Sequence, residues 1–219
     1  CDNFSEFEKM READPEKWRL TLSDEIHPNM GGHKAIAEQL AKTISGENAS
    51  LDEVGPPIPS LLKSTEAVVS GKSLKVLAMP PFDELAEAAL NTRFPDARME
   101  MVKWEVEGRS LHQLRKEASH LVRKMRPDLV LLTVPRSATA ANREEFIDSV
   151  YWMTNYSLSF GKAEWDCVVI HPSVLDSKKM ENDDLIRKLT ANHDLTLIDR
   201  APGDKRDAKI LLSEWVVAQ

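Results

Sequence analysis

Cysteine, aromatic residues and long apolar runs are all scarce in this sequence. Only two of its 219 residues are cysteine, Cys1 and Cys167, and aromatic residues make up 6% of the chain. This pair gives neither a disulfide framework nor the spacing of a metal site, so the sequence predicts neither. Cys167 lies in an apolar strand pattern, which is typical of a buried free thiol.

Membrane spans, nucleic-acid surfaces and cofactor sites are not indicated either. No apolar run approaches the roughly 20 residues that a membrane-spanning helix needs. The net charge is −7 and no stretch combines basic with aromatic residues, so nothing draws the chain generally to nucleic acid or to an anionic membrane. Ser70-Gly71-Lys72-Ser73 lacks the first glycine and the preceding strand of a phosphate-binding loop. We therefore expect no cofactor and no resident metal ion.

Residues 72–219 show a regular alternation of apolar and amphipathic segments. The apolar segments predict strands and the amphipathic ones predict helices. The expected strands are 74–79, 98–102, 128–134, 165–170 and 195–199, and the expected helices are 83–93, 111–125, 143–156, 182–192 and 206–217. Strands that are apolar throughout, each followed by a helix, predict a parallel sheet in a three-layer α/β fold of the flavodoxin type.

The first 71 residues have a different character. In residues 1–46 we expect a short amphipathic helix broken at Asp14-Pro15, a short strand over 18–22, and a helix that begins after Asn29. Residues 47–71 are predicted to be a linker, in which Gly55-Pro-Pro-Ile-Pro59 forms a stiff extended spacer and 59–69 a short helix. A segment of about 46 residues is too short for a doubly wound domain of its own.

The most informative motif is Asp24-x-x-His27-Pro28-Asn29, at the start of the expected helix. A carboxylate three residues before a histidine can orient the imidazole and stabilise its charged form, so that the ring acts as a general base. Pro28 restrains the backbone, and Asn29 is a good helix N-cap. The same pattern also suits a simple turn-and-cap device, and spacing alone leaves both interpretations open.

The longer block Asp24-x-x-His-Pro-Asn-x-x-Gly-His33 resembles the last conserved block of the SGNH (GDSL-type) hydrolases, a family of serine esterases and lipases. The resemblance implies that His27 is the base and Asp24 its orienter, whereas His33 matches a position without a catalytic role. It also implies a small ester as substrate, often an acyl or acetyl group on a carbohydrate or lipid. The flavodoxin-like three-layer fold is the fold of this family too.

In that family the block closes the catalytic domain, whereas here it stands near the first residue. We therefore expect residues 1–46 to be the closing segment of a catalytic domain, with the nucleophilic serine on an upstream segment or a partner chain. A chain that begins with Cys-Asp-Asn suggests a processed or truncated product. The compartment stays open, and a secreted or periplasmic location is compatible with the sequence. Whether this chain alone is an enzyme also stays open.

Residues 72–219 do not retain the family's chemistry. The turn at 79–83, where the family places its serine, contains none, and the segment 199–204 contains no histidine. We therefore expect a second SGNH-like domain without a triad. A non-catalytic binding or assembly module is the alternative from another class of function. Another alternative is that the N-terminal helix packs back on the 72–219 sheet and brings His27 near Ser110, Ser137 or Ser173.

Three further groups of residues in the second unit are candidate sites. Arg136 follows the third expected strand and could hold an anion, although a solvated loop arginine is the simpler interpretation. His171 and Ser173 follow the fourth strand, at the edge where open α/β sheets bind ligands, but residues so close in sequence diverge too much to form a dyad. His112 and His120 are eight residues apart on one helix, which is too far to chelate one ion.

Overall fold

The computed structural model describes residues 1–56 and 58–219, and Pro57 of the expected spacer lies outside the described residues. Its centre is a five-stranded sheet in the order β2-β1-β3-β4-β5, and all the strand pairs are parallel. The strands are β1 (Leu74–Ala78), β2 (Met99–Lys103), β3 (Leu129–Thr133), β4 (Asp166–Ile170) and β5 (Thr196–Ile198). The predicted flavodoxin-like fold class is confirmed.

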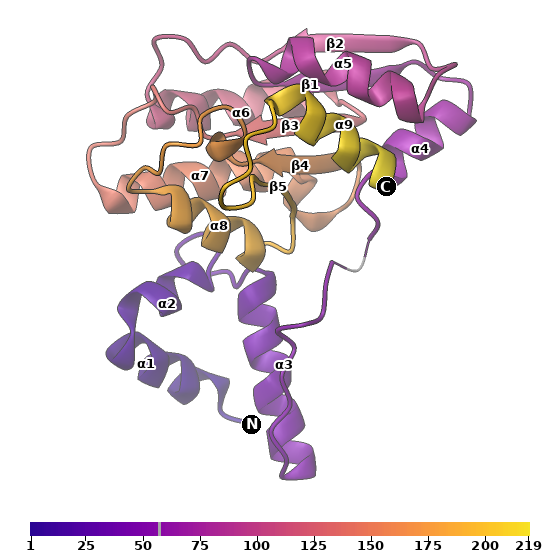
Figure 1. The fold of residues 1–219 in the computed structure, drawn as a ribbon. Coiled ribbons are helices and arrows are strands. Elements are labelled where there is room, and N and C mark those ends of the chain that lie inside the picture. Colours follow the sequence, from indigo (N-terminus) through magenta and orange to yellow (C-terminus); the bar gives the residue numbers. More distant parts are fainter. Residues whose placement is uncertain (57) are drawn as a thin grey trace.

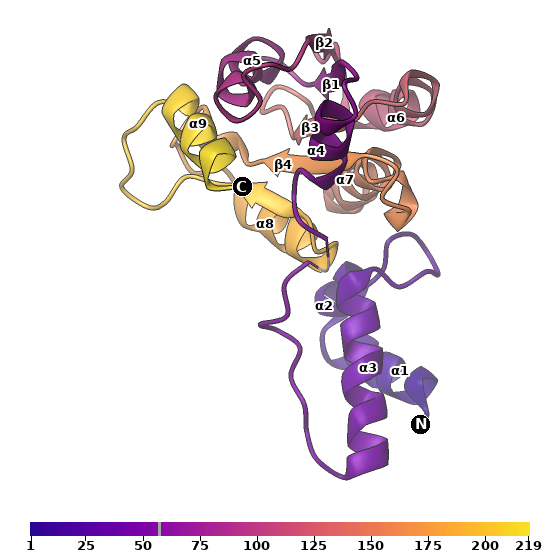
Figure 2. The ribbon, with the colours of Figure 1, turned by 90° about the vertical axis from the view of Figure 1, so that its right-hand side faces the viewer.

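Helices cover both faces of the sheet and complete three layers (Figures 1 and 2). One face carries α4 (Leu62–Val69), α5 (Phe82–Arg93) and α9 (Ala208–Ala218), and the other carries α6 (Leu111–Met125), α7 (Arg143–Ser157) and α8 (Asp183–Asn192). Two short 3-10 turns, η1 (Ser159–Gly161) and η2 (Pro172–Val174), precede and follow β4. Every strand and helix predicted in 72–219 is confirmed to within two residues at each end.

Alternate side chains of each central strand enter two different cores. Val76 of β1 and Leu131 of β3 pack with α5 and α9, whereas Leu77 and Leu132 pack with α6 and α7. All four side chains are at most 2% exposed. Because successive strand residues point to opposite faces and both faces are covered, the central strands are apolar at every position.

The N-terminal segment, which we define as residues 1–46, contains α1 (Asn3–Ala13), α2 (Pro15–Leu20) and α3 (Met30–Ser45). The strand expected over 18–22 is wrong, because α2 occupies most of that stretch. Asp14 accepts a hydrogen bond from the Lys17 amide at 2.9 Å, and Pro15 is at the first turn, so the residues that end α1 also start a new helix. Five alternating residues were too short a pattern to outweigh this cap.

The N-terminal segment packs against α7 and α8, on the side of those helices that faces away from the sheet (Figures 1 and 2). Leu20 is 5% exposed and joins the core on the α6–α8 side. Arg19 pairs with Glu144 at 2.7 Å, and Lys34 pairs with Asp194 at 2.7 Å. Packing of the N-terminal helix on the sheet itself, one of the alternatives above, is therefore wrong, because α7 and α8 already cover that face. The division into separate domains stays a prediction.

We expect Leu20→Ala to lower the free energy of unfolding by about 2–5 kcal/mol, since it leaves a cavity where the segment meets α7 and α8. Leu40→Ala is the matched control, because Leu40 is 46% exposed and its truncation should change stability by less than about 0.5 kcal/mol. Urea unfolding and limited proteolysis of residues 1–46 measure both effects. Equal responses of the two variants would contradict this docking.

Candidate functional site

The Asp24-x-x-His27 motif lies on a tight loop between α2 and α3. Leu22 and Pro28 form an isolated antiparallel bridge, and the Ser23 amide donates to the His27 carbonyl at 2.8 Å. Asn29 closes the loop: its side-chain oxygen accepts from the Gly32 amide at 3.0 Å and caps α3. The predicted N-cap is confirmed, and the loop is short because backbone bonds tie its two arms together.

Asp24 holds His27 through both of its carboxylate oxygens. Oδ1 accepts hydrogen bonds from the backbone amides of Ile26 at 2.9 Å and His27 at 2.8 Å. Oδ2 lies 2.7 Å from His27 Nδ1. Partial burial opposes the ionised carboxylate, but these hydrogen bonds and the imidazole outweigh it, so the pKa of Asp24 is below its ordinary value. An ionised partner at Nδ1 selects the tautomer whose Nε2 lone pair is free to accept a proton.

The reactive nitrogen of His27 faces outward. The side chain is 69% exposed, and among the described residues its ring contacts no hydrogen-bonding partner other than Asp24. Asp24 and His27 do not line the cavity at Trp104 or the other four cavities described for residues 1–56 and 58–219. The structure thus brings the two predicted site residues together on an exposed loop.

None of the three candidate serines is hydrogen-bonded to His27 within the described part of the chain. Ser110 caps α6 by accepting the Gln113 amide at 3.3 Å. Ser173 donates to Asp199 at 2.7 Å, and Ser137 lies in an exposed turn after β3. The alternative that these serines complete the site therefore finds no geometric support.

Two side chains of α7 donate hydrogen bonds to the first arm of the loop, and we call Tyr151 and Asn155 the α7 clamp. The Tyr151 hydroxyl donates to the Leu20 carbonyl at 2.6 Å, and the Asn155 amide donates to the Ser23 carbonyl at 2.8 Å. Both are at most 5% exposed. No sequence motif marked these two residues. The only indication in the sequence is that a tyrosine and an asparagine stand four residues apart on the face of a helix that is expected to be buried.

His193 supports the α7 clamp from α8. Its ring lies 4.8 Å from the Tyr151 ring, Nδ1 lies 3.0 Å from the Leu189 carbonyl, and Nε2 lies 3.3 Å from Asn155 Oδ1. A neutral ring carries one N–H and serves one of these acceptors at a time. Burial nevertheless dominates over the Leu189 carbonyl and lowers the pKa of His193 to about 4, so the ring is neutral at pH 7.

The carboxyl edge of the sheet contains a serine, a histidine and an aspartate whose hydrogen bonds stabilise the local fold. The Ser173 hydroxyl donates to Asp199, while His171 Nδ1 accepts the Ser173 amide at 3.1 Å and His171 Nε2 donates to the Asp183 carbonyl at 3.0 Å. Burial outweighs the nearby acceptors and lowers the pKa of His171. Both ring nitrogens are occupied, so this histidine offers Ser173 no base, which agrees with the prediction that the pair is not a dyad.

The other polar candidates are engaged in local contacts. Arg136 lies 3.3 Å from each carboxylate oxygen of Asp183, which favours the structural interpretation over an anion site. Cys167 is a half-buried free thiol, and burial raises its pKa.

Among residues 1–56 and 58–219, no group of three or more histidine, cysteine or acidic residues could hold a metal ion. None of the described helices combines the length and the apolar character needed to cross a membrane.

Gly32 makes the tight loop sterically feasible. A Cβ at this position would lie 2.4 Å from the Thr21 carbonyl oxygen and 2.8 Å from Pro28 Cβ. We therefore expect Gly32→Ala to push α3 away from the loop, to destabilise the protein by about 1–3 kcal/mol and to speed amide exchange over residues 21–29. Gly55→Ala is the control, since nothing lies within 4 Å of its Cβ position. Normal exchange in Gly32→Ala would contradict this close approach.

His193 also makes stability depend on pH. A histidine with a folded pKa of about 4 and an unfolded pKa of about 6.5 stabilises the fold fully above pH 6.5, and this contribution is lost as the pH falls toward 4. The loss amounts to at most roughly 3 kcal/mol. We expect His193→Gln to flatten the dependence of unfolding free energy on pH in this window, measured by urea titration. The exposed His33→Gln should retain the full dependence, and an unchanged slope in His193→Gln would refute the assignment.

Comparisons with protein-family models, with curated proteins and with solved structures find no significant match to this chain. The resemblance of residues 24–33 to one hydrolase block therefore rests on those residues and on their geometry.

Proposed function

We propose that Asp24 and His27 are the acid–base pair of an SGNH-type ester hydrolase. The observation that carries the proposal is the contact of 2.7 Å between Asp24 Oδ2 and His27 Nδ1, with Nε2 exposed. A capping device alone would need the carboxylate but not the imidazole, because Asp24 Oδ1 already accepts both backbone amides. Asp24 Oδ2 instead contacts the His27 ring, which plays no part in capping the helix.

The chemistry assigned to the pair follows the serine-hydrolase scheme. A serine on an upstream segment or on a partner chain attacks the ester carbonyl, and His27 Nε2 takes the hydroxyl proton. Asp24 stabilises the imidazolium that forms, and His27 then returns the proton to the leaving alcohol. Water, deprotonated by the same ring, releases the acyl group as a carboxylic acid. The substrate class is a small ester, such as an acylated carbohydrate or a lipid.

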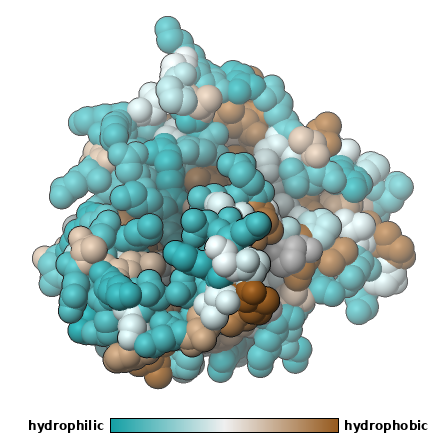
Figure 3. Space-filling model, turned by 90° about the horizontal axis from the view of Figure 1, so that it is seen from below, coloured by the Kyte–Doolittle hydropathy of each residue, from teal (hydrophilic) through white to brown (hydrophobic). Residues whose placement is uncertain are grey.

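Apolar side chains exposed on the N-terminal segment support a contact with the part that carries the serine. Large apolar residues exposed in the N-terminal segment are Phe4, Ile26, Met30, Leu40 and Ile44. Figure 3, which looks at the molecule from below, shows hydrophobic patches among the hydrophilic surface on this side. Ile26 is 75% exposed and directly precedes His27. Exposed apolar surface beside a reactive group is typical of an interface that excludes water from the site.

The test uses the protein expressed from its full reading frame and a p-nitrophenyl ester series. His27→Ala should lower kcat/KM by about 10³-fold or more, and Asp24→Asn should do so to a similar or smaller extent. His33→Ala is the matched control, since His33 is an exposed histidine on the first turn of α3, and it should leave activity unchanged. A fluorophosphonate probe should label a serine outside residues 1–219. Equal losses in His27→Ala and His33→Ala would refute the proposal.

A non-catalytic binding or assembly module is the second candidate, and the carboxyl edge of the sheet favours it for residues 72–219. There Asp199 accepts from Ser173, from Arg187 at 2.6 Å and from the Arg200 amide at 2.8 Å. Because Asp199 and Ser173 are engaged with these structural partners, this cluster is not poised for catalysis. Ester turnover that survives His27→Ala and Asp24→Asn would leave this candidate as the better account of the chain.

A further inference from the structure

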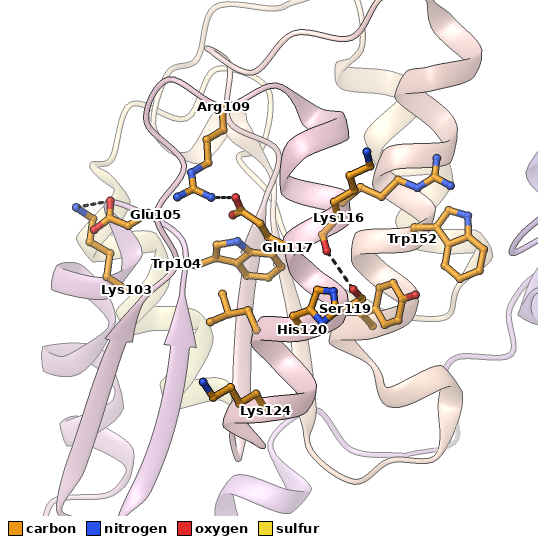
Figure 4. Close-up of a pocket in the computed structure, with 13 residues that line it drawn as sticks. Lys103, Trp104, Glu105, Arg109, Lys116, Glu117, Ser119, His120, Lys124 and Trp152 are labelled. Carbon is orange, nitrogen blue, oxygen red and sulfur yellow. Dashed lines mark hydrogen bonds and ion pairs between the residues drawn. The ribbon is translucent and has the colours of Figure 1, made fainter.

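A large cavity lies far from His27, between α6, α7 and the segment that follows β2 (Figure 4). Its volume is about 840 Å³, which is in the range of small-molecule sites. More than half of its lining comes from α6, and neither the sequence motifs nor the proposed hydrolase uses it. Neither Asp24 nor His27 lines this cavity, so a role for it does not depend on the proposed hydrolase.

Aromatic rings form the inner wall of this cavity. Trp104 is fully buried, and its indole Nε1 has no hydrogen-bond partner among the described residues. The rings of Trp152 and Tyr156 lie 5.7 Å apart with their planes 32° from each other. A buried N–H without an acceptor is costly. Because this N–H is covered, a ligand oxygen would have to displace the neighbouring side chains to form the hydrogen bond that the described residues do not make. The two neighbouring rings offer two apolar faces that are tilted relative to each other.

The rim of the cavity carries an excess of positive charge. Two pairs neutralise each other: Lys103 lies 3.1 Å from Glu105, and Arg109 contacts Glu117. Three further cations, Arg115, Lys116 and Lys124, also line the cavity. Arg115 lies over the Trp152 ring at 5.7 Å and has only a distant carboxylate, Asp148 at 3.8 Å.

Lys116 and Lys124, unlike Lys103, have no ion-pair partner within the described residues. Lys116 and Lys124 are eight residues apart on α6, so they share one face of the helix about two turns apart. Both side chains border the same cavity (Figure 4). Negatively charged groups that enter the cavity would therefore meet one free ammonium group at each of two places along α6.

We propose that this cavity binds an acidic sugar, that is, a saccharide carrying a carboxylate such as a hexuronate unit. The C–H face of a sugar ring would pack on Trp152 and Tyr156, and a ring oxygen or hydroxyl would accept a hydrogen bond from Trp104 Nε1. Because Lys116 and Lys124 lie about two turns apart, carboxylates on different sugar units would face them. A mononucleotide shares the combination of a ring and an anion. The tilt and spacing of the two aromatic rings leave no parallel slot for a base between them, which favours the sugar.

The test follows the Trp104 indole N–H resonance in a ¹⁵N-labelled protein while ligand is added, with calorimetry for the affinity. The probes are a uronic-acid trisaccharide, its neutral hexose counterpart and a mononucleotide. We expect the uronic-acid trisaccharide to shift the Trp104 resonance, to bind with a Kd of about 1 mM or tighter, and to bind several-fold more weakly in 0.5 M salt than in 0.05 M salt. The neutral sugar should bind at least several-fold more weakly.

Surface variants keep the test independent of folding. The double variant Lys116→Gln and Lys124→Gln should raise the Kd for the uronic-acid trisaccharide by about tenfold. The control pair Lys72→Gln and Lys209→Gln removes the same charge from exposed positions outside the cavity and should leave the Kd unchanged. Equal binding of the neutral sugar, binding of the nucleotide alone, an unmoved Trp104 resonance or the absence of binding would each overturn the proposal.

Discussion

The hydrogen bonds to the Leu20 carbonyl connect the N-terminal segment to the α/β unit, and the geometry of the candidate site depends on them. This carbonyl accepts from the Tyr151 hydroxyl at 2.6 Å and from the Asn29 side chain at 2.7 Å. One donor belongs to α7, and the other caps the helix that follows His27. Because both converge on one buried oxygen, the start of α3 and the end of α2 are fixed relative to α7. The Asp24–His27 loop therefore has one defined shape.

Two polar clusters of the described residues show that similar residue types can have different chemical possibilities, depending on their geometry. Ser173, His171 and Asp199 have the composition of a triad, yet both nitrogens of that buried ring are occupied by backbone groups. Asp24 and His27 lack a serine among the described residues, yet the carboxylate binds Nδ1 and leaves Nε2 exposed. Only the second arrangement leaves a ring nitrogen without a hydrogen-bond partner among the described residues, which a general base requires.

Sequence reasoning predicted most of the fold and the contact between Asp24 and His27. Continuous apolar strands such as Leu129–Thr133 and amphipathic helices such as Leu111–Met125 have strong periodic signals, and both are present where they were expected. The Asp24–His27 contact was predictable because its geometry is local. The strand expected over 18–22 failed because a short alternating pattern competes poorly with an N-cap. Tyr151, Asn155 and the cavity at Trp104 were missed because they depend on elements far apart in sequence.

By itself the sequence determined the parallel three-layer fold, the capped helix after Asn29 and the orientation of His27 by Asp24. Hydrophobic periodicity and bonds between residues three apart decide these features, and both can be recognised along the chain. Tertiary structure alone decided that the N-terminal segment packs on α7 and α8, that Asn155 and Tyr151 hold the loop, and that Trp104 keeps a free donor in a basic cavity. Those contacts join residues more than a hundred positions apart or leave a group unpaired, and no local pattern specifies either outcome.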